Sequence, residues 1–149
     1  MKLSSKGRYA VMAMVDIAKY AEDKPCKLSN IALRQNISLH YLEQIFLKLK
    51  KSNLVRSHRG PGGGYKLLGS KKDIKVSDVI SAVDESIKTT GCNNSATSFC
   101  TGKNVRCLTH DLWEDLEILI EGYLESVSLH DLVVGNKNSF LEERNYEQS

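Results

Sequence analysis

Three cysteines and one histidine lie within a short stretch of the second half of the chain: Cys92, Cys100, Cys107 and His110. Thiolate sulfur and imidazole nitrogen are ligands of soft metal ions and of iron–sulfur clusters. Seven, six and two residues separate successive members, whereas structural zinc sites usually hold ligands in pairs two to four residues apart. Only Cys107 and His110 fit the zinc pattern. The spacing therefore favours a small iron–sulfur cluster, with thiol redox chemistry or another metal as alternatives.

The segments around these residues predict how the chain would present them. Residues 89–106 are rich in Thr, Gly, Asn and Ser, which predicts an irregular loop, and long loops inside compact chains are commonly functional or disordered. A helix is predicted from Thr109, with Cys107 and His110 on one side of its first turn. The dipole at a helix start stabilises an anionic cluster or a thiolate. The ordinary alternatives are a buried apolar cysteine and a capping histidine. Cys26, beside Pro25, is interpreted as structural.

Composition narrows the class of protein. The content of 41% hydrophobic and 26% charged residues is typical of a globular domain. Four cysteines could form two disulfides in an exported protein, but residues 1–8 lead into no secretory segment, and no apolar run is long enough to cross a membrane. We therefore expect a cytoplasmic protein without a membrane partner, in which clustered thiols serve a metal or redox site.

The charge is divided unevenly along the chain. Residues 1–75 hold 16 Lys and Arg against 5 Asp and Glu, a net charge of +11, and residues 76–149 hold 5 against 13, a net charge of −8. A strongly positive half suits a polyphosphate partner, because neutralised phosphates release their counterions. The basic half is thus either a nucleic-acid-binding surface or a solvated basic face.

The basic half carries the pattern of a helix-turn-helix unit. Apolar residues at helical spacing predict a helix over residues 6–21. A short second helix is expected to start with Ser29 as its N-cap, and a third, amphipathic helix starts from Ser38. Two short helices joined by a tight turn are typical of DNA-binding proteins, but the pattern alone is weakly specific.

A glycine-rich hairpin follows and strengthens this interpretation. Residues 54–58 and 65–68 are predicted to be strands, joined by the turn Arg59-Gly60-Pro61-Gly62-Gly63-Gly64. Glycines allow the backbone to approach a sugar-phosphate chain closely, as the wing of a winged helix does. The turn lacks the Gly-Lys-Ser/Thr ending of a nucleotide-binding loop, and no enzyme signature is present.

The remaining segments complete the predicted organisation, which is mainly α with a small β-hairpin wing. A short helix is expected over residues 76–83. The apolar stripe of the long helix from Thr109 is broad enough to pack against the first domain or against a second copy of itself, and a two-fold DNA reader favours the homodimer. The predicted division is a winged helix-turn-helix domain (1–85), a cluster-binding loop (86–108), a dimerisation helix region (109–134) and a flexible polar tail (135–149).

At this point the chain resembles a family of bacterial winged-helix regulators that contains a branch binding iron–sulfur clusters. The resemblance covers about residues 1–134 and rests on five segments: Ser5-Lys6-Gly7-Arg8-Tyr9-Ala10, Tyr41-Leu42-Glu43-Gln44, Arg59-Gly60-Pro61-Gly62-Gly63-Gly64-Tyr65, Val79-Ile80-Ser81-Ala82-Val83-Asp84-Glu85 and Cys107-Leu108-Thr109-His110. It implies a [2Fe-2S] cluster held by the three clustered cysteines and His110. It also implies a transcription regulator of iron–sulfur assembly genes that binds double-stranded operator DNA as a homodimer and receives clusters from assembly proteins. The cysteines are spaced slightly wider than in the family pattern, a difference that concerns the conformation of the loop more than the identity of the ligands.

Roles at the DNA can then be assigned by chemistry. The start of the third helix is expected to face the major groove, where Gln pairs with adenine and Glu accepts from cytosine. Arg59 suits a narrow minor groove, and four other cations suit phosphate contacts, which position the protein without specifying sequence. For Tyr41, core packing is an equal alternative. The candidates are His40, Tyr41, Glu43 and Gln44 for bases, Arg59 for the minor groove, and Lys6, Arg8, Lys48 and Lys51 for phosphates.

Two other functions stay open. The same DNA reader could use its loop thiols as a redox switch or as ligands of a different metal. A metal-trafficking or scaffold protein, in which the basic half is only a solvated surface, is the third hypothesis.

Overall fold

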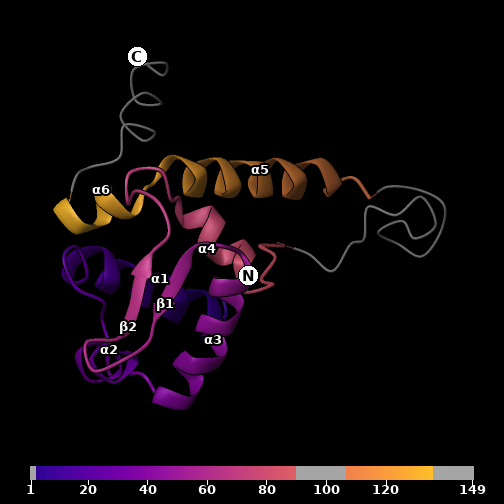
Figure 1. Ribbon diagram of the computed structural model, residues 1–149. Coiled ribbons are helices and arrows are strands. Elements are labelled where there is room, and N and C mark those ends of the chain that lie inside the picture. The colour runs from indigo at the N-terminus through magenta and orange to yellow at the C-terminus, as the bar shows by residue number, and fades with distance from the viewer. Residues whose placement is uncertain (1–2, 90–106, 136–149) are drawn as a thin grey trace.

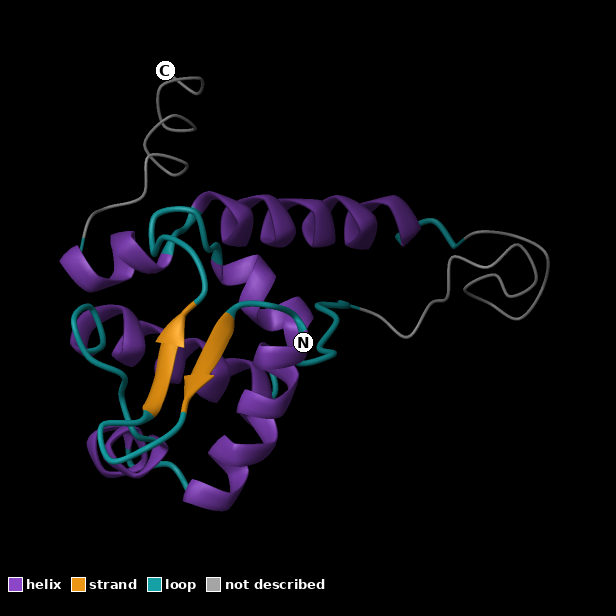
Figure 2. Ribbon diagram, viewed as in Figure 1, coloured by secondary structure: helices purple, strands orange, loops and turns teal. Residues whose placement is uncertain are grey.

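The computed structural model describes residues 3–89 and 107–135. Within these residues the chain forms helices and one antiparallel hairpin, which confirms the expected mainly α fold with a β wing (Figures 1 and 2). The elements run in the order α1 (Ser5–Tyr20), α2 (Leu28–Gln35), α3 (Leu39–Lys51), β1 (Val55–His58), β2 (Gly64–Leu67), α4 (Val76–Ala82), α5 (His110–Ser126) and α6 (Leu129–Val134). The predicted tail lies outside the described residues from position 136 onward, as does most of the predicted loop.

The core of the N-terminal half lies between α1, α3 and the hairpin. Helix α1 buries small and apolar residues at helical spacing, among them Ala13, Met14 and Ile17, and α3 buries its Leu42, Ile45, Phe46 and Leu49 face. The Phe46 ring meets the Tyr65 ring of β2 edge-on, with centroids 4.9 Å apart. The polar residues of α3 are therefore left on the outer side of the helix.

The N-cap of α3 is the residue predicted from the sequence, whereas the N-cap of α2 is a different residue. The Ser38 hydroxyl accepts a hydrogen bond from the Tyr41 N–H at 3.4 Å and caps α3 as expected. The expected cap at Ser29 is wrong, because α2 already begins at Leu28 and Lys27 is its N-cap. The backbone carbonyl of Lys27 accepts from the N–H groups of Asn30 and Ile31, which moves the start upstream.

The hairpin is attached to α2 through its backbone. Strands β1 and β2 pair in the register Val55↔Leu67 to His58↔Gly64. Tyr65 exchanges two backbone hydrogen bonds with Cys26, at 2.9 and 2.8 Å. Gly64, with φ +151°, lies so close to the Cys26 carbonyl that a side chain there would collide with the backbone. The glycine therefore allows the wing to lie against the segment that leads into α2.

A buried ion pair connects α1 with α2. The Asp16 side chain is fully buried and accepts three hydrogen bonds, from Arg34 Nε at 2.9 Å, Arg34 Nη2 at 2.6 Å and Gln35 Nε2 at 2.8 Å. Arg34 also lies over the Tyr20 ring and donates to the Cys26 sulfur at 3.0 Å. Asp16 raises the pKa of Arg34 through these hydrogen bonds. Cys26 itself is buried in the core, as its structural interpretation required.

The C-terminal half leaves the core and then returns to it. Helix α5 runs along α4 and projects beyond it, as Figure 1 shows, and none of its residues is fully buried. The chain turns back at Val127 and Ser128, where Ser128 pairs with Lys75 and caps α6. Leu129 of α6 is completely buried beside α1. Among the described residues, no helix combines the length and the apolar character that a membrane span requires.

Replacing Asp16 tests how much stability the buried ion pair contributes. We expect Asp16→Ala to lower the free energy of unfolding by about 3 kcal/mol, because Arg34 and Gln35 lose their shared acceptor and a buried site is left empty. Urea denaturation followed by circular dichroism measures the change.

The exposed carboxylate of Asp23, just beyond α1, provides the matched control. Asp23→Ala should stay within about 0.5 kcal/mol of the unmodified chain. Equal unfolding midpoints for the two variants would contradict the role given to Asp16.

Candidate nucleic-acid interface

The first turns of α3 present three of the base-reading candidates to solvent. His40, Glu43 and Gln44 are exposed, and the His40 side chain retains 81% of its accessible surface. Gln44 Nε2 lies 3.2 Å from His40 Nε2, and His40 Nδ1 lies 4.0 Å from the Glu43 carboxylate. The three side chains therefore form one polar group on the outer face of α3, where donors and acceptors are available to base edges.

Tyr41 lies differently from its neighbours. Its ring is half-buried and meets the Tyr9 ring edge-on, with centroids 5.7 Å apart and an interplanar angle of 89°. Such a pair contributes packing energy between α1 and α3. The structure thus places the Tyr41 ring in a packing contact, and a DNA-contacting role for its hydroxyl stays a prediction.

The predicted phosphate contacts occupy unequal environments. Arg8 and Lys51 are exposed, and Lys6 is half-buried. Lys48 donates to the Asp84 carboxylate at 2.7 Å. Asp84 raises the pKa of Lys48, and Lys48 lowers the pKa of Asp84. A phosphate at Lys48 would compete with this exposed carboxylate, which the sequence pattern did not reveal because the two residues lie far apart in the chain.

The wing carries the ninth candidate. Arg59 is exposed between β1 and the glycine run. Gly60 has φ +105°, a conformation that glycine adopts without strain, and its carbonyl accepts from the Gly63 N–H at 2.9 Å. The turn is therefore tight and free of bulky side chains beyond Arg59 and Pro61, as a loop that enters a groove requires.

The predicted cluster ligands are described only in part. Cys92 and Cys100 lie outside the described residues. His110 is the first residue of α5, as expected for its first turn, whereas Cys107 lies before the helix, so the expectation that it also belongs to the first turn is wrong. The Cys107 carbonyl accepts from the His110 N–H at 3.1 Å, and the Cys107 sulfur lies 3.6 Å from the Thr109 hydroxyl. One backbone hydrogen bond thus keeps the thiol and the imidazole at the same end of α5.

Two carboxylates lie beside this histidine that sequence reasoning did not single out. Ligand atoms of His110, Asp111 and Glu114 lie within 4.8 Å of one another. The spacing of one and four residues on a helix could have indicated them. A soft thiolate and an imidazole suit an iron–sulfur cluster, and the added carboxylates extend the donor set toward harder metal ions.

The sequence matches a known protein family over most of its length. The family model of Rrf2, described as an iron-dependent transcriptional regulator, matches residues 3–135. The chain belongs to the Rrf2 family. The Rrf2 relatives include the HTH-type transcriptional regulator IscR of Aliivibrio salmonicida, 53% identical over 92% of this chain and 80% of the relative, and IscR of Vibrio cholerae, 49% identical over 92% of this chain and 78% of the relative.

Solved structures agree with this assignment. IscR of T. potens superposes with a TM-score of 0.74 and 36% identity over 92% of this chain and 89% of its own. CymR of B. subtilis, titled the global cysteine regulator, superposes with a TM-score of 0.77 and 30% identity over 92% of this chain and 99% of its own. This Rrf2 chain is thus a DNA-binding transcriptional regulator with a winged-helix fold.

Two variants of α3 separate base reading from phosphate contact. We expect Gln44→Ala to lose about 1–3 kcal/mol of discrimination at one base pair, because its amide pairs with a base edge. We expect Lys51→Gln to weaken binding to operator and scrambled duplexes alike and to reduce the salt slope by about one. Fluorescence anisotropy at several salt concentrations measures both.

Lys72, an exposed lysine in the segment that leads to α4, serves as the control. Lys72→Gln carries the same charge change as Lys51→Gln and should leave both affinities unchanged. An equal loss in the two lysine variants would show that only the overall charge matters.

Proposed function

We propose that this Rrf2 protein is a sequence-specific DNA-binding regulator that senses iron–sulfur cluster status and controls iron–sulfur assembly genes. Its ligands for a [2Fe-2S] cluster are Cys92, Cys100, Cys107 and His110, and assembly proteins donate the cluster. Binding to the chromosome gives it a cytoplasmic site of action. The observation that carries the proposal is the Cys107–His110 backbone hydrogen bond at the start of α5, in a chain similar to IscR over most of its length.

The chemistry of the donor set supports the cluster. Thiolates stabilise ferric iron, and replacement of one thiolate by imidazole raises the reduction potential of a cluster. The start of α5 adds backbone dipoles that favour negative charge. Imidazole is a neutral ligand and lacks the charge attraction that a thiolate has for iron, so His110 is the ligand that would leave most easily. This arrangement suits a cluster that is gained and lost.

The path from the ligands to the DNA-reading helix runs through α4. Helix α5 packs against α4 through Leu124 and Tyr123 beside buried Ile80. Asp84, just after α4, binds Lys48 of α3. A change in the position of α5 would therefore be passed to α4 and to the Lys48–Asp84 contact, and a cluster held at the start of α5 could bias how α3 meets an operator in this way.

A homodimer follows from the uncovered face of α5. Leu112, Leu116, Leu119 and Tyr123 share one side of the helix at spacings of three and four residues. The C-terminal part of this side packs against α4, whereas Leu112 and Leu119 are 58% and 39% exposed. A second copy of the same helix would cover them and would place two wings on one two-fold operator.

The cluster is tested by anaerobic reconstitution of the full chain. We expect a coloured protein with about two iron atoms and two acid-labile sulfides per chain. Cys107→Ala should abolish the colour, and His110→Ala should change the visible spectrum and shorten the cluster lifetime. Electrophoretic shifts with loaded and cluster-free protein should differ on at least one operator.

Cys26→Ala is the matched control, because Cys26 lies in the core, and it should retain full iron and sulfide content. A colourless protein without iron and sulfide after reconstitution would refute the cluster. Bound metal without sulfide would favour a mononuclear site that uses His110, Asp111 and Glu114.

Two single substitutions, each of which introduces one carboxylate on α5, test the dimer. Leu119→Glu should convert a dimer to a monomer in sedimentation equilibrium, because a carboxylate would be buried between two apolar helices. Ile118→Glu places the same charge at a 60% exposed position on the other side of α5, and the dimer should persist. Monomers of the unmodified chain at micromolar concentration would contradict the interface.

A further inference from the structure

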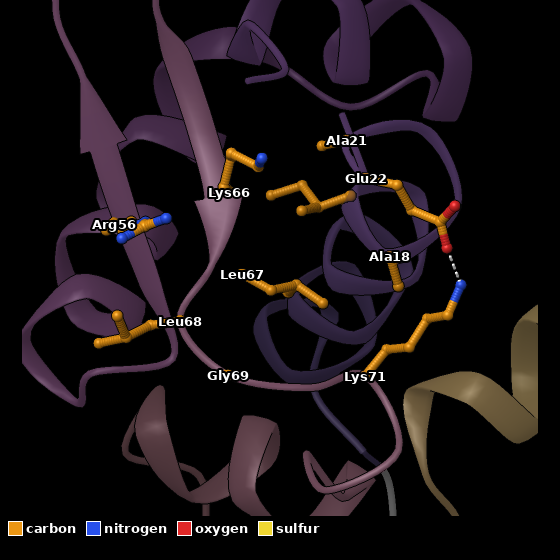
Figure 3. A pocket seen from close by; sticks show the side chains of 10 residues that line it. Ala18, Ala21, Glu22, Arg56, Lys66, Leu67, Leu68, Gly69 and Lys71 are labelled. Carbon is orange, nitrogen blue, oxygen red and sulfur yellow. Dashed lines mark hydrogen bonds and ion pairs between the residues drawn. The ribbon is translucent and has the colours of Figure 1, made fainter. Parts of the chain in front are cut away.

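A cavity of about 410 Å³ lies at the base of the hairpin, and none of its lining residues belongs to the predicted DNA contacts or cluster ligands. Figure 3 shows it between two walls. One wall is Ala18 near the end of α1 with Ala21 and Glu22 just after the helix, and the other is Arg56 and Lys66 of the strands with Lys71 of the segment that follows them. Its volume falls within the range of small-molecule sites, roughly 300–1,000 Å³. The cavity is therefore large enough for a small organic ligand.

The floor and the rim of this cavity differ in chemistry. Ile17, Ala18 and Ala21 are buried core residues and give it an apolar floor, together with half-buried Leu67. The ionisable groups around it are three cations and one carboxylate. An apolar floor with a charged rim fits a ligand that has an apolar body and an ionised group.

The positive charge of the rim is only partly balanced. Glu22 forms an ion pair with Lys71, marked by the dashed line in Figure 3. This contact lowers the pKa of the Glu22 carboxyl. Lys66 Nζ makes one 3.4 Å hydrogen bond, to the backbone carbonyl of Asp23. Within residues 3–89 and 107–135, no side-chain hydrogen bond or ion pair involves Arg56. Two cations therefore keep donors available for a ligand.

Arg56 and Lys66 also lie next to each other on the hairpin. Arg56 and Lys66 are direct cross-strand partners in the hairpin register, so their side chains leave the same face of the sheet side by side. Like charges at such positions are destabilising. An anion between them would remove this repulsion, and a guanidinium beside an ammonium matches the oxygens of a carboxylate or a phosphate.

The position of the cavity separates it from the predicted DNA contacts. The turn with Arg59 closes at the pair His58↔Gly64, whereas the Arg56↔Lys66 pair lies two positions further along the ladder, beside the open end at Val55↔Leu67. The opposite wall belongs to the C-terminal end of α1. A ligand there would connect the base of the wing to α1.

We propose that this cavity binds a small organic anion, a phosphate or carboxylate on an apolar body, with Arg56 and Lys66 holding the charge and the α1 end receiving the apolar part. Such a ligand is an effector separate from any cluster, because the cavity shares no residue with Cys107 or His110. Its binding fixes the hairpin against α1.

The test is calorimetric titration of the full chain at constant ionic strength in a phosphate-free buffer. Phenyl phosphate or benzoate should bind at least tenfold more tightly than inorganic phosphate or phenol, because only the first two combine an ionised group for the rim with an apolar body for the floor. Benzoate, titrated in parallel, distinguishes a carboxylate from a phosphate preference. Arg56→Gln and Lys66→Gln should each weaken the preferred anion at least tenfold.

Lys72→Gln removes a neighbouring charge that does not line the cavity and should leave anion binding unchanged, and unfolding curves establish that all variants are folded. Equal affinities for phenyl phosphate, benzoate, phenol and inorganic phosphate would overturn the proposal. So would a finding that Arg56→Gln and Lys66→Gln lower the salt slope of operator binding by about one each while neither organic anion binds, because the two cations would then be DNA phosphate contacts.

Discussion

The buried carboxylate of Asp16 is the constraint on which the DNA-reading half depends. A carboxylate with no exposed surface is strongly destabilising unless it is fully hydrogen-bonded, and here all of its side-chain donors come from the end of α2. That requirement fixes the rotation of α2 about its axis. The same Arg34 reaches the Cys26 sulfur, and the Cys26 backbone pairs with Tyr65 in the wing. One charge inside α1 thereby sets the relative positions of α1, α2 and the hairpin.

The position of α2 in turn determines the orientation of the start of α3. Ile37 and Ser38 follow α2 after only a left-handed residue at Asn36, so an orientation imposed on α2 is passed to the start of α3. The His40, Glu43 and Gln44 group lies on the first two turns of α3. The base contacts proposed for these side chains would therefore depend on the buried Asp16–Arg34 ion pair for their rigid support.

Much of the architecture could be predicted from the sequence. Helical spacing of apolar residues located α1, α3 and α4 within one or two residues, and the glycine run located the hairpin turn, because these signals are local. The start of α2 was misplaced since a serine beside a helix start is a common cap, and only the chain path showed that Lys27 occupies that position. The exposed chemistry of α3 was likewise read from its amphipathic pattern.

Contacts between distant residues could not be predicted. The Asp16–Arg34 and Lys48–Asp84 pairs join residues 18 and 36 positions apart, and no local pattern distinguishes these carboxylates from solvated ones. The Tyr9–Tyr41 contact resolved the position of a ring that spacing left open. The cavity beneath Arg56 and Lys66 depends on strand register together with the end of α1, which only the folded chain brings together.

Helix α5 is held at its C-terminal end only a few residues from the core, because α6 returns to the core directly after it. Its C-terminal end is clamped by Val127, Ser128 and Leu129, which bond to the segment around α4 and pack on α1, whereas its N-terminal end projects from the body of the protein (Figure 1). A helix of 17 residues is about 25 Å long, so a small rotation at the clamp corresponds to a large displacement at Cys107 and His110. Conversely, a large movement at this projecting end would deliver only a small rotation to α4, against which the C-terminal part of α5 packs.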